Sequence, residues 1–97
     1  MPWNNPASYP FSPPFIQAHA PASSGVYALY TEQQWIYFGE SMDIRERLLQ
    51  HHANPSACMA RFPPESFSFE LLPDRQRVAR QDQLILEFRP VCNERLG

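Results

Sequence analysis

The chain has 97 residues, 43% of them hydrophobic, which predicts one globular domain with a modest core. Ten carboxylates against eight arginines, with no lysine, exclude broad, sequence-blind coating of nucleic acid but allow a small site with a few well-placed cations. No apolar run could span a membrane and no secretory signal opens the chain, so we expect a cytoplasmic protein. In that compartment, Cys58 and Cys92 are interpreted as small buried thiols rather than as a disulfide or a metal pair.

Residues 1–23 are predicted to form a proline-rich arm that contains no Asp, Glu, Lys or Arg. The prolines exclude a long helix or a strand. Ser12 as a cap and Pro13 as the first helical residue predict one short helix. A partner-binding role for the arm, through its PxxP pattern, is a weaker alternative than packing on the body of the protein. The side chains expected to hold the arm there are Phe11, Phe15 and Ile16.

Residues 24–97 are expected to form the main domain, which opens with two strands. Segments 25–30 and 35–38 are rich in strand-forming residues and are separated by a polar turn, so they predict a hairpin. Segment 66–71 alternates polar and apolar side chains without error, which predicts a third strand. The side chains of this strand expected to point inward are Phe67, Phe69 and Leu71.

Two helices complete the predicted domain. The first follows Asp43, which can cap it, and residues 53–65 behind it are predicted to be a loop with several prolines. The second runs from a cap at Asp74 to about Phe88. The predicted architecture is a small α/β (α+β) domain in which helices flank a three-stranded sheet. The inward positions of the second helix are Val78, Gln81, Ile85 and Phe88, with glutamine as the polar exception.

Several short motifs follow one another in an order that resembles the GIY-YIG nuclease family. The first strand carries Gly25-Val26-Tyr27 and the second carries Tyr37-Phe38-Gly39. Arg47 and His51 follow on one face of the first helix, and segment 43–48, which contains Arg47, is similar to the first helix of that family. Segment 89–93 is similar to the closing Arg-Pro-x-x-Asn turn of the family. The resemblance covers about residues 24–94 and implies a GIY-YIG-like fold behind the arm.

The resemblance implies a divalent-metal-dependent endonuclease that hydrolyses DNA phosphodiester bonds, on single- or double-stranded DNA. It assigns activation of the attacking water to Tyr27 and a hold on the scissile phosphate to Tyr37. Arg47 would neutralise the phosphate with its guanidinium fork, and His51 would bind the phosphate or help a proton move. The implied cofactor is a single Mg²⁺ or Mn²⁺ ion. The residues assigned to substrate binding are Gly39, Arg45 and Asn93.

One position departs from the family pattern. The family places a metal-binding glutamate twelve residues before the asparagine, and here that position is Gln81. Glutamine keeps a carbonyl oxygen but lacks the negative charge that Mg²⁺ prefers. Of the nearby acids, Glu40 is the least unsuitable substitute because it follows Gly39 directly. We expect Gln81 to lie near Tyr27 and Arg47 at one concave site.

Several interpretations of Gln81 stay open at this point. The chain is a catalytically inactive nucleic-acid-binding module, an active nuclease that holds its metal through the amide carbonyl and water, or a nuclease silenced by an introduced glutamine. A helical amide without any role is the fourth. Arg75, Arg77 and Arg80 either follow a DNA backbone or pair with neighbouring acids, and Trp35 and Phe62 are expected to pack rather than to stack on a base.

Overall fold

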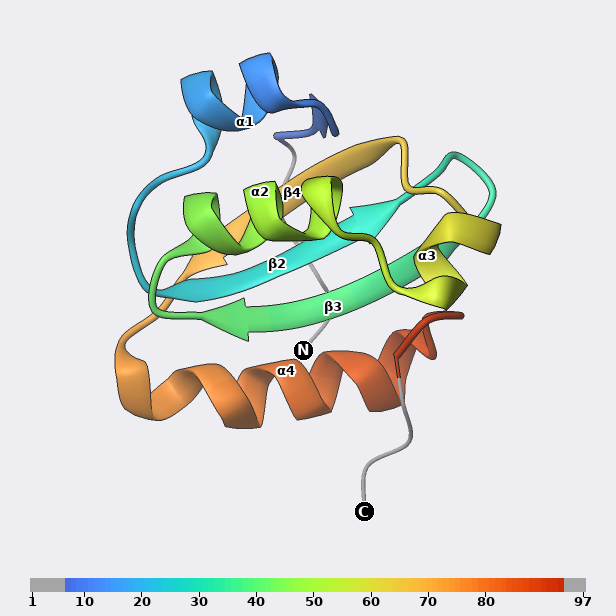
Figure 1. Cartoon of the computed structure of the whole chain (residues 1–97). Helices are drawn as coiled ribbons and strands as arrows, with labels where there is room; N and C mark the ends of the chain where they lie inside the picture. The colour runs from blue at the N-terminus through green and yellow to red at the C-terminus, as the bar shows by residue number, and fades with distance from the viewer. Residues whose placement is uncertain (1–6, 94–97) are drawn as a thin grey trace.

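The computed structural model describes residues 7–93 of the chain. A four-stranded antiparallel sheet with the strand order β1-β4-β2-β3 carries helices on both faces (Figure 1). The strands are β1 (Tyr9–Pro10), β2 (Gly25–Tyr30), β3 (Trp35–Ser41) and β4 (Ser66–Leu71). The helices are α1 (Pro13–His19), α2 (Ile44–Ala53), α3 (Ala57–Arg61) and α4 (Asp74–Phe88). The predicted α+β architecture and the order of its main elements are confirmed.

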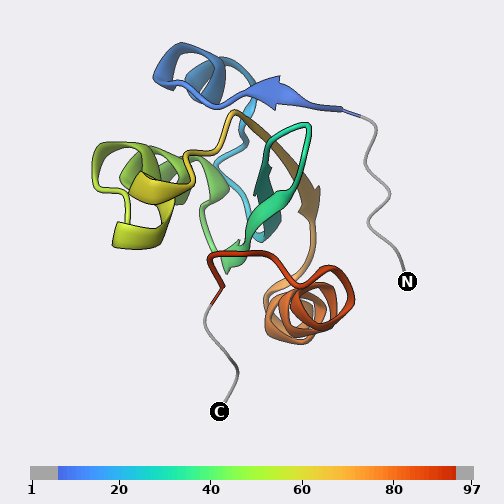
Figure 2. The same ribbon diagram turned by 90° about the vertical axis from the view of Figure 1, so that its right-hand side faces the viewer.

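The central strand β2 divides the core into two layers. Its side chains alternate between the two faces of the sheet, as the pleat of a strand requires. Tyr27 and Leu29 join a cluster with α1 and α2, whereas Val26 and Ala28 join a cluster with α4. All four side chains are 0% exposed. Figure 2 shows α4 nearly end-on, on the side of the sheet opposite to the other three helices.

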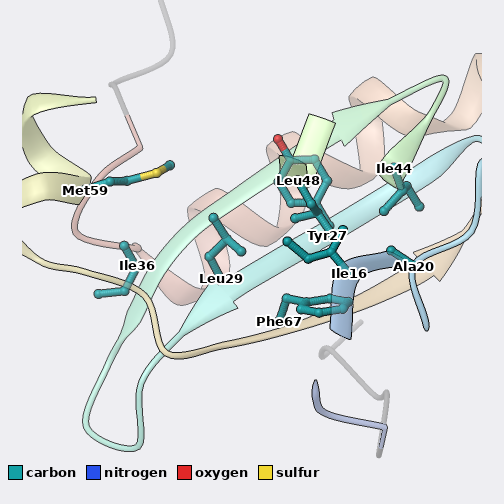
Figure 3. Close-up of a cluster of buried hydrophobic side chains, with 9 residues drawn as sticks. All are labelled: Ile16, Ala20, Tyr27, Leu29, Ile36, Ile44, Leu48, Met59 and Phe67. Carbon is teal, nitrogen blue, oxygen red and sulfur yellow. The ribbon is translucent and has the colours of Figure 1, made fainter. Parts of the chain in front are cut away.

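The layer beneath α1 and α2 is the larger of the two hydrophobic clusters. Ile16 of α1 and the pair Ile44 and Leu48 of α2 pack with Phe67 of β4 around the ring of Tyr27 (Figure 3). Asp43 caps α2, because its side chain accepts a hydrogen bond from the backbone N–H of Glu46 at 3.0 Å. The predicted start of this helix is therefore confirmed, and the helix is oriented by the same core that buries Tyr27.

The proline-rich arm contributes the fourth strand, which the sequence prediction lacked. Tyr9 lies opposite Phe67 in the β1–β4 pairing, at the edge of the sheet, where a proline is tolerated. The short helix α1 is confirmed, with Ser12 at its N-cap position and Ile16 fully buried. The expected anchor Phe15 is wrong, because this ring is 43% exposed while Phe11 packs against the core.

The inward face of α4 also differs from the prediction. Val78 is 53% exposed, and Leu84 is the side chain that the sheet buries completely. Pro73, rather than Asp74, occupies the N-cap position. Hydrophobicity alone selected Val78, but Arg77 and Arg80 turn toward the sheet instead, where they pair with acids of β3 and β4. A count of apolar residues does not anticipate this. The third strand is likewise inward only in part, since Leu71 at its end is 56% exposed.

Residues 53–65 are more ordered than the predicted loop. They contain α3, which Ser56 caps by accepting a hydrogen bond from the N–H of Met59 at 3.2 Å. This helix brings Cys58 to Cys92, and the two form a disulfide with Cα atoms 5.6 Å apart. The expectation of two free buried thiols is wrong, because a separation of 34 residues in sequence does not report proximity in space. The cytoplasmic location, from which that expectation was drawn, stays a prediction.

Candidate functional site

Two tyrosines and a histidine meet on the α2 face of the sheet. In the β2–β3 register Tyr27 lies opposite Gly39 and Leu29 lies opposite Tyr37, so the two phenols are diagonal neighbours on one face. Their ring centroids are 6.1 Å apart. His51, near the end of α2, lies 5.7 Å from the ring of Tyr27 and 5.2 Å from that of Tyr37. The three residues that the motifs selected therefore form one cluster.

A hydrogen bond of 2.7 Å joins the hydroxyl of Tyr27 to Nε2 of His51. Burial and the neighbouring Tyr37 raise the pKa of Tyr27 far above its usual value, more than Arg47 lowers it. Burial and the charge of Arg47 lower the pKa of His51 to about 4. At neutral pH the phenol is therefore protonated and the imidazole is neutral. In the tautomer that carries its proton on Nδ1, Tyr27 donates the hydrogen bond and Nε2 accepts it.

Arg47 lies one helical turn before His51, on the exposed side of the cluster. Its guanidinium is close enough to Tyr27 to influence the pKa of the phenol by both charge and hydrogen bonding. An exposed guanidinium beside buried neutral groups presents a charged fork to solvent while the proton-carrying atoms remain covered. That arrangement suits an anionic ligand such as a phosphodiester.

Gly39 leaves room for the ring of Tyr27 at the candidate site. A Cβ atom placed on it would collide with the hydroxyl end of Tyr27 and would lie 2.8 Å from Cε2 of Tyr37. The requirement is one of space, because the backbone of Gly39 has an ordinary φ. Gly39 therefore acts on the candidate site by letting the phenol of Tyr27 lie across strand β3. Its assignment to substrate binding stays a prediction.

Asn93 fastens the end of the described chain to strand β3. Its side-chain amide donates to the carbonyl of Phe38 and its carbonyl accepts from the N–H of Phe38, both at 2.7 Å. The backbone N–H of Cys92 also donates to the carbonyl of Ile36 at 2.8 Å. The segment after α4 thus lies along the outer edge of β3 without forming a strand. This gives Asn93 a structural role, and its predicted contact with substrate remains untested.

Arg45 lies away from the tyrosine cluster. Its Nε donates to the backbone carbonyl of Ala20 at 2.8 Å, which ties the start of α2 to the segment after α1. A guanidinium used in this way positions the arm. Its predicted role in substrate binding gains no support from these contacts and stays a prediction.

Gln81 lies on α4, which packs on the face of the sheet opposite to the tyrosine cluster. It is half-buried on α4, and its amide donates to Oδ1 of Asp82 at 3.4 Å. One turn earlier on the same face, Arg77 forms an ion pair with Glu40 of β3, with Nε 3.4 Å from Oε1. Glu40 follows Gly39 directly, so this part of α4 lies along the β3 edge. The proximity of Gln81 to Tyr27 itself remains a prediction.

A divalent ion would find few ligands here. Gln81 offers one neutral carbonyl oxygen, and Glu40 already faces the Arg77 cation. Across residues 7–93, no three side chains of His, Cys, Asp or Glu cluster as a metal site would require. These donors fit an ion held by one amide oxygen and otherwise by water and substrate, as Mg²⁺ tolerates better than Ca²⁺.

The Arg77–Glu40 pair is the part of the site region that sequence reasoning missed. The basic run at 75–80 was expected either to follow DNA or to pair with acids on its own helix. The expected pairing within the helix is confirmed for Arg77, whose Nη1 lies 3.9 Å from Oδ1 of Asp74. In addition, Arg77 and Arg80 reach across to Glu40 and Glu70 on the sheet, and both arginine side chains are about nine-tenths buried. The sequence signal that could have placed Arg77 at the site region is its spacing, because Arg77 lies four residues before Gln81 on the same helical face.

No family model and no curated protein sequence matches the chain. Solved structures do. The GIY-YIG N-terminal endonuclease domain of UvrC from Thermotoga maritima, bound to magnesium, superimposes with a TM-score of 0.70 at 21% identity over 81% of this chain and 96% of that one. A point mutant of that domain, bound to its catalytic divalent cation, gives a TM-score of 0.71 at 21% identity over 82% of this chain and 96% of that one. The chain therefore has the fold of a GIY-YIG endonuclease domain.

Proposed function

We propose that this chain is a DNA endonuclease that hydrolyses phosphodiester bonds with the help of a divalent metal ion. The observation that carries the proposal is the buried Tyr27–His51 hydrogen bond beside the exposed guanidinium of Arg47. The similar solved domains are described as endonuclease domains bound to a catalytic divalent cation, which supports the same chemistry here.

The residues of the cluster have separate roles in hydrolysis. Arg47 binds the anionic phosphate, which removes the repulsion that an incoming nucleophile would meet. The attacking water bonds to phosphorus as the bond from phosphorus to the leaving oxygen breaks. The water transfers a proton to the phenolic oxygen of Tyr27, the phenol passes its own proton to Nε2 of His51, and the leaving oxygen takes a proton from solvent. A phenol with so high a pKa is a poor source of phenolate, so this relay avoids forming one.

Tyr37 lies against both members of this proton relay. Its ring limits the access of solvent to the hydrogen bond, and its hydroxyl is assigned to the scissile phosphate. Gln81 would hold the metal ion through its carbonyl oxygen. When bound, such an ion polarises the phosphate and stabilises the leaving oxygen.

A second candidate function is binding without cleavage. Two observations favour it: the position assigned to the metal carries an amide, and no trio of potential metal-ligating side chains is found within residues 7–93. Arg47 would then still bind the phosphate backbone, but the leaving oxygen would lack its stabilising charge.

A cleavage assay decides between the two candidates. Labelled single- and double-stranded DNA are incubated with the protein as written and with Gln81→Glu, in Mg²⁺, in Mn²⁺ and in EDTA. Gln76→Glu adds a carboxylate to an exposed position of the same helix and serves as the matched control. We expect Gln81→Glu to cleave at least about tenfold faster than the protein as written, only with metal, because a carboxylate binds a hard cation better than an amide does.

The other outcomes also have definite meanings. Metal-dependent cleavage by the protein as written at the rate of Gln81→Glu means that the amide suffices. Absence of cleavage, combined with DNA binding that Arg47→Ala abolishes, favours the binding module. Absence of both cleavage and DNA binding contradicts both candidate functions.

A further inference from the structure

A hollow opens beside the tyrosine cluster, between the arm, the end of α2 and the segment that contains α3. Its volume is about 210 Å³. The arm contributes Phe11, α2 contributes His51 and His52, α3 contributes Met59, and the following loop contributes Pro63 and Pro64. In Figure 1 the end of α2 leads directly into α3, so one continuous stretch of chain forms most of the wall.

We propose that this hollow is a subsite for one unpaired nucleobase of the DNA strand whose phosphate binds at Arg47. The inference rests on the proposed function, because it requires a nucleic-acid backbone at the cluster. It adds the class of substrate: DNA that is single-stranded or locally unpaired.

The first argument is continuity. His51 belongs to both sites, since Nε2 accepts from Tyr27 at 2.7 Å while the same residue lines the hollow. Arg47 lies one turn earlier on the same helix. A strand whose phosphate is bound by Arg47, beside His51, therefore carries its neighbouring base toward the mouth of the hollow.

The second argument is the chemistry of the walls. Phe11 meets His52 edge to face, with ring centroids 5.3 Å apart, and prolines and Met59 supply the remaining apolar surface. None of the described residues that line the hollow is Asp, Glu, Lys or Arg. A phosphate would find no strong cation in it, whereas a flat, uncharged aromatic ring finds rings and prolines to stack on.

The third argument is size. A volume of about 210 Å³ equals that of about seven water molecules at ~30 Å³ each. Sites for drug-sized ligands usually exceed ~300 Å³, so the hollow suits a single ring system better than a folded peptide. A base that is paired and stacked in a duplex cannot enter a pocket, so the occupant must be unpaired.

The experiment measures binding in EDTA by fluorescence anisotropy, which separates binding from cleavage. Labelled single-stranded oligonucleotides carry either all their bases or one abasic position, placed at each site in turn. The proteins are the chain as written, Phe11→Ala, and Ala60→Trp, which fills the hollow from α3 without removing a core side chain. Phe15→Ala is the matched control, since this ring is on the same arm, 43% exposed, and not part of the hollow.

We expect Phe11→Ala and Ala60→Trp each to weaken binding of the intact strand by about 10- to 100-fold, the usual effect of losing one stacked base. One abasic position should weaken binding to the chain as written by a similar factor and should have no further effect on Phe11→Ala. Phe15→Ala should bind like the chain as written. A duplex of the same sequence should bind more weakly than the single strand.

The inference is overturned if abasic strands bind as tightly as intact ones, or if the abasic and Phe11→Ala effects simply multiply. Because Phe11 packs against the core, thermal unfolding of the variant is measured in parallel, and Ala60→Trp provides the test that does not depend on it. If DNA binding requires Arg47 but is unchanged by the abasic position and by Ala60→Trp, the subsite is contradicted and the proposed function is not. Absence of DNA binding altogether contradicts the proposed function.

Discussion

The two faces of the sheet bury polar side chains in opposite ways. On the α2 face, Tyr27 and His51 are neutral and satisfy each other through one short hydrogen bond. On the α4 face, Arg80 is a buried cation that meets Glu70 through two hydrogen bonds, with Nε 2.8 Å from Oε1. One face is therefore suited to moving a proton, and the other to neutralising fixed charge.

The second ion pair on the α4 face, Arg77–Glu40, makes fewer hydrogen bonds than the Arg80–Glu70 pair. Arg77 is as buried as Arg80, at 12% and 11% side-chain exposure, but its Nε lies 3.4 Å from Glu40. Among the described residues, its Nε and Nη1 make no hydrogen bond. The pair stands at the β3 edge, where the charge of Glu40 also raises the pKa of Tyr27 slightly. The two faces thus communicate electrostatically across β3, next to Gly39.

The largest effect is expected on the proton-moving face. Tyr27→Phe removes the phenolic oxygen and keeps the ring, so we expect the cleavage rate to fall by about 10²–10⁴-fold. The rate is measured with the protein as written or with Gln81→Glu, whichever of the two cleaves DNA. Tyr30→Phe is the control, because it removes the hydroxyl that bonds Ser8 from the far end of the same strand and should leave the rate unchanged. A normal cleavage rate in Tyr27→Phe would show that the phenolic oxygen takes no part in the reaction.

Gly39→Ala tests the point where the two faces meet. The added Cβ collides with the hydroxyl end of Tyr27, so we expect the free energy of unfolding to fall by about 1–3 kcal/mol. Urea denaturation measures the change. In the Tyr27→Phe background most of the loss should remain, because Cζ of this ring and Cε2 of Tyr37 still lie in the way of the added Cβ. A loss that vanishes with the phenolic oxygen would show that the ring carbons can move aside.

Glu70→Gln tests the charge-neutralising face. It leaves the buried guanidinium of Arg80 beside a neutral amide, so we expect a loss of about 1–2 kcal/mol in unfolding free energy, reduced from the value for a fully buried pair because Glu70 is 30% exposed. The exposed turn residue Glu32, changed to Gln, is the control. The cleavage rate should stay the same, and a fall in rate at unchanged stability would contradict the division between the faces.

The smallest effect is a pH dependence that belongs to the α2 face. His51 has a folded-state pKa of about 4 against an unfolded value of ~6.5, so the unfolded chain binds more protons between these values. The stabilising contribution of the neutral imidazole is therefore present above pH ~6.5 and is lost as the pH falls toward 4. His51→Gln should flatten the slope of Tm against pH in this window, and His52→Gln should not. An unchanged slope in His51→Gln would mean that other groups set it.

The sequence alone determined the parts of the site that depend on local periodicity. The alternation of strand residues places Tyr27 and Tyr37 on one face, and the helical spacing of Arg47 and His51 places them on one side of α2. Asp43 marks the start of that helix because a short carboxylate side chain satisfies a free N–H locally. Each of these features involves residues close in sequence, where backbone geometry leaves few alternatives.

Only the tertiary structure decided the contacts that join distant segments. The Cys58–Cys92 disulfide, the β1–β4 pairing, and the pairing of Arg77 with Glu40 each need two elements to be docked before the partners are known. A local sequence pattern shows whether a segment is a helix or a strand and which of its faces is apolar. It does not show which other element packs against that face. The sequence therefore identified Gln81 as the unusual residue, while docking of α4 on the sheet placed beside it a buried arginine–glutamate pair that no motif contains.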